Sequence, residues 1–204
     1  MYGTVAHLKV IPGRRHELNE LLDDRPVPVV AGWIANYLLE IDDDPDHAIF
    51  VSVFDSRESY HANAASSEQH ERYRRLRERL TEDPAWTDGE IFPYMSFRQP
   101  PAESRLYGSV ARMAVKPGAR QALNDFLEAA TVRFDQVRSM QAGYLVLAEN
   151  DPDLAVMVGV FDSEEAYRAN SESPEQHQRY LEMRSLLTQD PDWYNGHITP
   201  YLRF

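Results

Sequence analysis

Hydrophobic and polar positions alternate along the first residues of the chain, which is typical of a half-buried β-strand. The alternation covers residues 2–10, and the Pro12-Gly13 pair that follows predicts a turn. Leucines at helical spacing then predict a helix directly after the turn. Pro26 and Pro28 are expected to end this helix early, because proline cannot donate a helical hydrogen bond.

The next segments have the pattern of two strands joined by a turn. Residues 33–41 have strand character, and residues 48–54 (AIFVSVF) are almost continuously apolar, which predicts a strand buried on both faces. Residues 42–46 (DDDPD) lie between them. This acidic run invites a calcium interpretation, but a calcium loop of helix-loop-helix proteins also needs a glycine at the bend and a distal glutamate. Since aspartate favours turns through bonds to the backbone, we expect a plain hairpin turn.

Two further helices and a last strand complete the unit. Ser56 is expected to cap a short helix, a second helix is expected over residues 66–81, and residues 90–97 are expected to form the last strand. Counting this helix pair as one layer, the order is strand, helix, strand, strand, helix, strand. That order is typical of the ferredoxin-like βαββαβ unit, an antiparallel sheet with helices on one face.

The whole pattern occurs twice. Residues 54–73 (FDSRESYHANAASSEQHERY) return as residues 161–180 (FDSEEAYRANSESPEQHQRY), with 13 of 20 positions identical. Further matches reach both ends, and each unit is too long for a solenoid repeat, so the chain is a tandem duplication. We expect a first domain over residues 1–97, a proline-containing linker over 98–105 and a second domain over 106–204.

Each predicted sheet has one face that its own helices leave uncovered. The apolar strands at residues 48–54 and 154–161 demand burial on both sides. Packing the two sheets against each other supplies it, and buried apolar area stabilises at roughly 25 cal/mol per Å². We therefore predict an α+β fold, with two ferredoxin-like units packed sheet-to-sheet as a barrel-like internal pseudo-dimer. Further pairing into a homodimer stays open.

Composition narrows the possible functions. The 204-residue chain is 43% hydrophobic and carries a formal net charge of −12, which argues against nucleic-acid and anionic-membrane partners. It has no cysteine, so disulfides and thiolate nucleophiles are excluded. No apolar run approaches the roughly 20 residues of a membrane span. The first residues do not resemble a signal peptide, and a cytoplasmic location is the default expectation.

Three features recur in both halves: an opening strand followed by Pro-Gly, a strand ending in Phe-Asp-Ser, and the motif Tyr-x-Ala-Asn-x-x-Ser-x-Glu-Gln-His. With these features the chain resembles the antibiotic biosynthesis monooxygenase family of dimeric α+β barrels. The resemblance implies an oxidoreductase that oxidises a phenolic or anthrone-like, polyketide-type small molecule with O₂ and without a cofactor. Such chemistry needs a base, a donor to the substrate oxyanion and a dry aromatic pocket.

The haem-degrading branch of that family carries an Asn-Trp-His set, which this chain lacks. The corresponding positions hold other residues, so haem is not expected: Ala6 and Ala111, Asn63 and Asn170, Tyr73 and Tyr180. No metal site is expected either, because the chain has neither a His-Glu-x-x-His motif nor a cluster of carboxylates with histidine.

The candidate site residues form matched pairs, one from each half. Asn63 and Asn170 are the candidate oxyanion donors; the simpler interpretation is an amide that bonds the backbone or caps its helix. Candidate aromatic contacts to the substrate, which could equally be core residues, are Tyr60, Tyr167, Tyr73, Tyr180, Trp86, Trp193, Tyr94 and Tyr201.

The remaining candidates are basic. His70 and His177 could serve as the catalytic base, and Arg77 and Arg184 could stabilise a peroxide or a phenolate. The alternative places these residues on a solvated helix margin. His7 has Arg112 at the matching position, and a lone strand histidine is more often structural.

Two functional predictions stay open at this point. A non-catalytic α+β-barrel module that binds a small aromatic ligand is the alternative to the enzyme. If the chain is an enzyme, the early end of the first helix predicts a more open site in the first half. We therefore predict that only one half carries full activity.

Overall fold

The computed structural model describes residues 1–22, 30–95, 105–134 and 139–202. Within these residues the chain forms eight strands and six helices. The first half comprises β1 Tyr2–Lys9, α1 His16–Leu22, β2 Trp33–Ile41, β3 His47–Phe54, α2 Arg57–Ala64, α3 Ser67–Arg77 and β4 Ala85–Met95. The second half comprises β5 Tyr107–Ala114, α4 Arg120–Phe134, β6 Met140–Ala148, β7 Leu154–Phe161, α5 Glu164–Ser171, α6 Pro174–Arg184 and β8 Asp192–Leu202.

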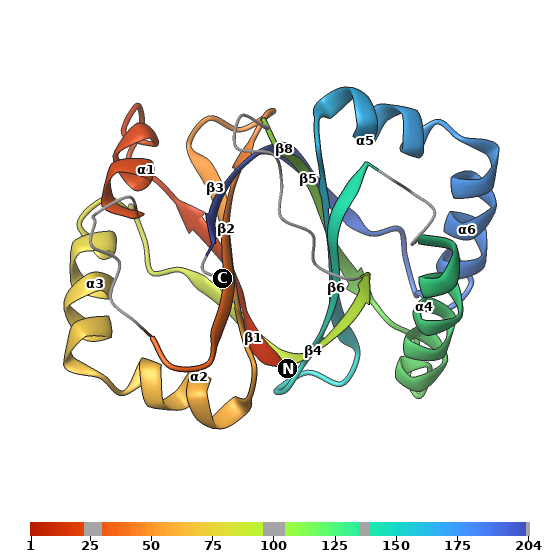
Figure 1. The fold of residues 1–204 in the computed structure, drawn as a ribbon, viewed down its shortest axis with the longest axis horizontal. Helices are drawn as coiled ribbons and strands as arrows, with labels where there is room; N and C mark the ends of the chain where they lie inside the picture. The colour runs from red at the N-terminus through yellow and green to blue at the C-terminus, as the bar shows by residue number, and fades with distance from the viewer. Residues whose placement is uncertain (23–29, 96–104, 135–138, 203–204) are drawn as a thin grey trace.

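The strands form one closed antiparallel barrel in the order β1-β3-β2-β8-β5-β7-β6-β4. Each half contributes a four-stranded sheet with the ferredoxin-like order, which confirms the predicted fold class. The two sheets also join edge to edge, because β2 pairs with β8 and β4 pairs with β6. Figure 1 shows α1–α3 flanking one side of the barrel and α4–α6 flanking the other.

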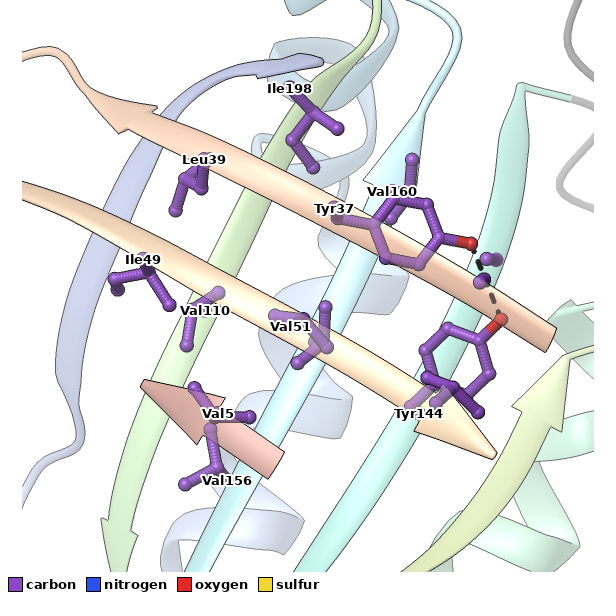
Figure 2. Close-up of a cluster of buried hydrophobic side chains, with 14 of the residues drawn as sticks. Val5, Tyr37, Leu39, Ile49, Val51, Val110, Tyr144, Val156, Val160 and Ile198 are labelled. Carbon is purple, nitrogen blue, oxygen red and sulfur yellow. Dashed lines mark hydrogen bonds between the residues drawn. The ribbon is translucent and has the colours of Figure 1, made fainter. Parts of the chain in front are cut away.

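Side chains from both halves fill the barrel. Valine, leucine and isoleucine from all eight strands or their flanking residues form one buried cluster (Figure 2). Within this cluster the hydroxyl oxygens of Tyr37 and Tyr144 lie 3.3 Å apart. Two smaller apolar clusters lie between the sheets and their helices, one for each sheet. Apolar burial on both faces of the sheet explains the continuously hydrophobic strands.

The seams between the two sheets depend on glycine. A Cβ atom added to Gly196 would lie 1.9 Å from the carbonyl oxygen of Glu40 on the neighbouring strand. At the other seam, a Cβ atom on Gly89 would lie 2.0 Å from the carbonyl oxygen of Leu147. Both glycines therefore allow strands from different halves to approach closely enough to pair.

Most predicted element positions agree with the structure. Ser56 caps α2, since its Oγ accepts a hydrogen bond from the Ser59 amide at 3.1 Å. Within the described residues α4 covers 15 residues and α1 covers 7, and each helix reaches the end of its described range. Pro26 and Pro28 and residues 98–104 of the expected linker lie outside the described residues.

Two boundaries were predicted wrongly. The last strand of the first half begins at Ala85 rather than at residue 90, because it pairs with β1 from that residue on. The sequence Asp88-Gly89 suggests a turn, whereas the glycine is needed for close strand approach. The second helix ends at Arg77 rather than at residue 81, because Leu80 leaves the helix to form a bridge with Val10.

The acidic turn between β2 and β3 is held by its own hydrogen bonds. The Asp46 amide donates to Asp44 Oδ1 at 3.2 Å, and the Gly13 amide donates to Asp46 Oδ1 at 3.1 Å. These contacts agree with the hairpin-turn interpretation. Across the described ranges, no group of three or more His, Cys, Asp or Glu residues could hold a metal ion. No helix within the same ranges is long and apolar enough to cross a bilayer.

Candidate functional site

Tyr60 and Tyr167 anchor the helices α2 and α5 on the outer face of the sheet. The Tyr60 ring centroid lies 5.1 Å from that of Tyr2, and the Tyr167 ring lies 5.1 Å from that of Tyr107. Burial, helped by the nearby Asp88 carboxylate, raises the pKa of Tyr60. Both candidate aromatic residues therefore face the sheet rather than solvent, and both are protonated at neutral pH.

Asn63 and Asn170 are partly buried residues near the junction of the two helices in each half. Their main-chain carbonyls accept hydrogen bonds from the hydroxyls of Ser66, at 2.8 Å, and Ser173, at 2.9 Å. A serine hydroxyl therefore holds the junction between the two helices in each half. Neither side-chain amide makes a hydrogen bond with any residue in the described part of the chain, so neither caps a helix nor bonds the backbone there.

The basic candidates lie on α3 and α6. His70 and His177 are exposed. Arg77 places Nε 2.5 Å from Asp83 Oδ1 and donates from Nη1 to the Leu80 carbonyl at 2.8 Å.

The second half repeats the arginine arrangement. Arg184 pairs with Asp190 and donates to the Leu187 carbonyl at 3.0 Å. The Tyr180 hydroxyl donates to the same Asp190 carboxylate at 3.3 Å. In both halves the arginine therefore fastens the turn that follows its helix.

The remaining aromatic candidates separate into two groups. Trp86 and Trp193 are 43% and 41% exposed, so neither is a core residue, and Trp86 lies beside Tyr73 with ring centroids 6.4 Å apart. Tyr94 is buried and donates its hydroxyl hydrogen to the Val158 carbonyl at 2.7 Å, which makes it a core residue. The side chain of Tyr201 lies outside the described residues.

Sequence reasoning missed a hollow at one end of the barrel, where β1 and β2 end and β3, β4 and β8 begin. Its volume is about 530 Å³, within the range that small-molecule sites occupy. The lining combines imidazoles, aromatic rings and acidic side chains: His7, Lys9, Ile41, Asp43, Asp44, His47, Glu82, Ala85, Trp193, Tyr194 and Asn195.

Two histidines meet in this mouth hollow. Nδ1 of His7 lies 3.1 Å from Nε2 of His47, and both rings stand edge-on to Tyr194, at 4.9 and 5.6 Å. Burial, together with the nearby charges of His47 and Arg112, lowers the pKa of His7 to about 4. Burial also lowers the pKa of His47. The pair is therefore neutral at neutral pH. The sequence offered His7 as a lone histidine, and only the pairing of Lys9 with His47 brings the second ring beside it.

Polar contacts also tie the two halves together at the seams. The Tyr2 hydroxyl donates to the Glu149 carboxylate, which Arg57 also binds. At the second seam the Tyr107 hydroxyl donates to Asp42 Oδ2 at 2.6 Å. Each tyrosine is the first residue of the first strand of its half, and each carboxylate lies in the hairpin turn of the other half.

The closed barrel of two ferredoxin-like units defines an α+β-barrel protein whose two subunit-like halves are fused in one chain. Residues 1–76 and 106–180 both match the antibiotic biosynthesis monooxygenase family. The chain therefore belongs to that family, and it holds two copies of the family domain. Family membership supports a monooxygenase activity.

Solved structures share the fold over almost the whole chain. A candidate monooxygenase from Lactobacillus acidophilus NCFM is 13% identical with a TM-score of 0.79, covering 98% of this chain and 95% of its own. A second candidate monooxygenase, from Fusobacterium nucleatum subsp. nucleatum ATCC 25586, is 7% identical with a TM-score of 0.82, covering 100% and 98%. An anthrone oxidase-like protein is 13% identical with a TM-score of 0.69, covering 98% and 92%. At these identities the likeness establishes the fold. Among curated proteins, none matches this sequence significantly.

Proposed function

We propose that this protein is a cofactor-independent monooxygenase that oxidises a phenolic or anthrone-like small molecule with O₂. The observation that supports this proposal is the burial and hydrogen bonding of Asn63 and Asn170. Both residues are partly buried, and among the described residues no hydrogen bond engages the N–H donors of either side-chain amide. Family membership supports the oxygenase class, and the anthrone oxidase-like relative suggests the substrate class.

The proposed reaction needs little from the protein. A base removes a proton from the substrate, and the resulting anion passes an electron to O₂ and forms a peroxide. The peroxide then collapses to the quinone, and one oxygen atom stays on the carbon while the other leaves as water. An anthrone loses both hydrogens from its methylene carbon, whereas a phenol loses one from the ring carbon and one from its hydroxyl. In this scheme the amide of Asn63 or Asn170 donates to the substrate oxyanion, and one such donor contributes about 3 kcal/mol.

The other roles are assigned on position. His70 and His177 lie on the helix that follows each asparagine and are the proposed bases. Tyr60 and Tyr167 lie three residues before each asparagine, hence on the same helix face, and are proposed to border the substrate. Arg77 and Arg184 each form an ion pair with a carboxylate, so we assign them only a minor role in stabilising the peroxide or phenolate.

The exposure of His70 and His177 favours a second candidate function. A base that lies in solvent gains little from a dry site, because its contact with the substrate proton is less controlled. With no other base assigned beside the asparagines, the same fold could hold an aromatic ligand without oxidising it. The non-catalytic binding module therefore stays the alternative.

The test is oxygen uptake by metal-free protein with a panel of anthrones and hydroquinones. The double variant Asn63→Ala/Asn170→Ala is expected to lower the rate above autoxidation about 100-fold, the usual effect of losing one oxyanion donor. Asn150→Ala, in an exposed turn, is the matched control and is expected to keep full activity. Uptake that the double variant leaves unchanged would move the site elsewhere. No uptake with any substrate would favour the binding module.

The single variants test whether the halves are equal. We expect one of Asn63→Ala and Asn170→Ala to remove most of the activity and the other to remove little, because the sequence places Pro26 and Pro28 after the first helix of the first half alone. Equal losses would contradict this expectation and point to two working sites.

A further inference from the structure

The mouth hollow is built by both halves of the chain. The first half supplies His7 and Lys9 from β1 and His47 from β3, and the second half supplies Trp193 and Tyr194 from β8. It is formed by strand ends at the barrel mouth, whereas the asparagines lie on helices outside the barrel. It is therefore a site separate from the one proposed above, and neither half of the chain forms it alone.

Among the described residues, the second half does not repeat the residue types that line this hollow. In the closed antiparallel order, β1 and β5 run in the same direction, so matching positions of the two halves face the same mouth. The matching positions hold residues of different chemistry: Arg112 for His7, Ala114 for Lys9, Leu154 for His47 and Thr87 for Tyr194. A homodimer of identical subunits would carry such a site twice around the axis. In the part of the chain that the structure describes, the fused protein presents this set of side chains on one side of the mouth only.

Both imidazoles line the hollow, and their contact decides which ring nitrogen is left to accept a hydrogen bond. His47 Nδ1 lies 3.8 Å from the carboxylate of Asp44, which favours the tautomer with its proton on Nδ1. Nε2 of His47 then accepts from Nδ1–H of His7. The remaining nitrogen of His7, Nε2, keeps its lone pair and can accept a hydrogen bond from a ligand hydroxyl.

Charge around the hollow favours a cation. Lys9 is paired with Asp44 at 3.1 Å. Asp43 and Glu82 are exposed, and neither makes an ion pair with any residue that the structure describes. The rings of Trp193 and Tyr194 add aromatic surface, which attracts both flat rings and ammonium groups.

We propose that the mouth hollow binds a small protonated aromatic amine that carries a ring hydroxyl. The ring lies against Trp193 and Tyr194, the hydroxyl donates to His7, and the ammonium group lies near Asp43 and Glu82. A hollow of about 530 Å³ accommodates a ligand of this size.

The test is calorimetric titration of the intact protein with three probes that share one ring. Tyramine carries both the hydroxyl and the amine, phenethylamine lacks the hydroxyl, and 4-hydroxyphenylacetate replaces the amine by a carboxylate. We expect tyramine to bind at least tenfold more tightly than either of the others. Binding of 4-hydroxyphenylacetate as tight as that of tyramine, or no binding of tyramine, would overturn the proposal.

The repeat supplies matched variants. Trp193→Ala is expected to weaken tyramine binding at least fivefold, while Trp86→Ala, at the matching and equally exposed position outside the hollow, leaves it unchanged. His47→Leu copies the residue that the second half accepts at the matching position, and it should also weaken binding at least fivefold. Equal effects of the two tryptophan variants would contradict the location.

The asparagine variants separate this proposal from the oxygenase proposal. Asn63→Ala/Asn170→Ala should bind tyramine as the unchanged protein does. Loss of tyramine binding in that variant would place tyramine at the helix site and refute a separate mouth site. Tyramine binding therefore tests the mouth hollow whether or not the protein consumes oxygen.

Discussion

Gly196→Ala is expected to disrupt the seam where β2 and β8 join the two halves. The residue pairs with Ile41 across the seam, and its added Cβ atom would lie 1.9 Å from the carbonyl oxygen of Glu40. A relaxed contact between carbon and oxygen is about 3.3 Å. The two strands would therefore have to separate locally by more than an ångström, and a backbone carbonyl cannot rotate away as a flexible side chain can.

The expected cost follows from this displacement. Overpacking of a well-packed site costs about 1–3 kcal/mol, and each ladder hydrogen bond lost adds about 1 kcal/mol. Alanine returns about 0.5–1 kcal/mol because it restricts the unfolded chain. The free energy of unfolding should thus fall by about 3 kcal/mol, which for a chain of this size lowers Tm by about 6–12 °C.

Urea and thermal unfolding of the purified variant measure this effect. Gly159→Ala is the matched control, a strand glycine of the same barrel. Its added Cβ atom would meet side-chain atoms alone: the flexible end of Met140 at 3.3 Å, the Phe161 ring at 3.4 Å and the Tyr94 hydroxyl at 3.8 Å. We expect its Tm to stay within about 2 °C of the original value, a change of at most about 1 kcal/mol. A Gly196→Ala protein as stable as Gly159→Ala would refute the idea that close backbone approach closes the barrel.

Two further predictions concern acid stability and helix capping. The folded-state pKa of His7 is lowered to about 4, so between that pH and about 6.5 the unfolded chain binds more protons than the folded protein, and stability falls on acidification. In urea unfolding at stepped pH, His7→Gln should make this fall in stability less steep. A pH dependence that the variant leaves unchanged would contradict the burial of a neutral ring. Ser163→Ala should cost about 1 kcal/mol in the same assay, because it removes the oxygen that accepts from the Ala166 amide at 3.2 Å. The exposed Ser67 serves as the capping control, and equal losses from both alanine variants would argue against the cap.

The sequence by itself determined the duplication and the fold class. Hydrophobic periodicity and turn residues are local signals, and a repeat presents each of them twice. The continuously apolar strands required burial on both faces, which two sheets in one chain provide. Ser56 could be recognised as a cap because capping depends on residues within one helical turn. The candidate asparagines came from the same local motif.

Only the tertiary structure decided how the halves close and what meets at the barrel end. The role of Gly89 could not be inferred from its neighbours in sequence, because the strand that approaches it belongs to the other half of the chain. His7 resembled a lone histidine, because His47 is 40 residues away and reaches it through strand register. Trp193 and Tyr194 join them from the second half. Strand pairing over such distances depends on the register of several strands at once, and no local pattern specifies it.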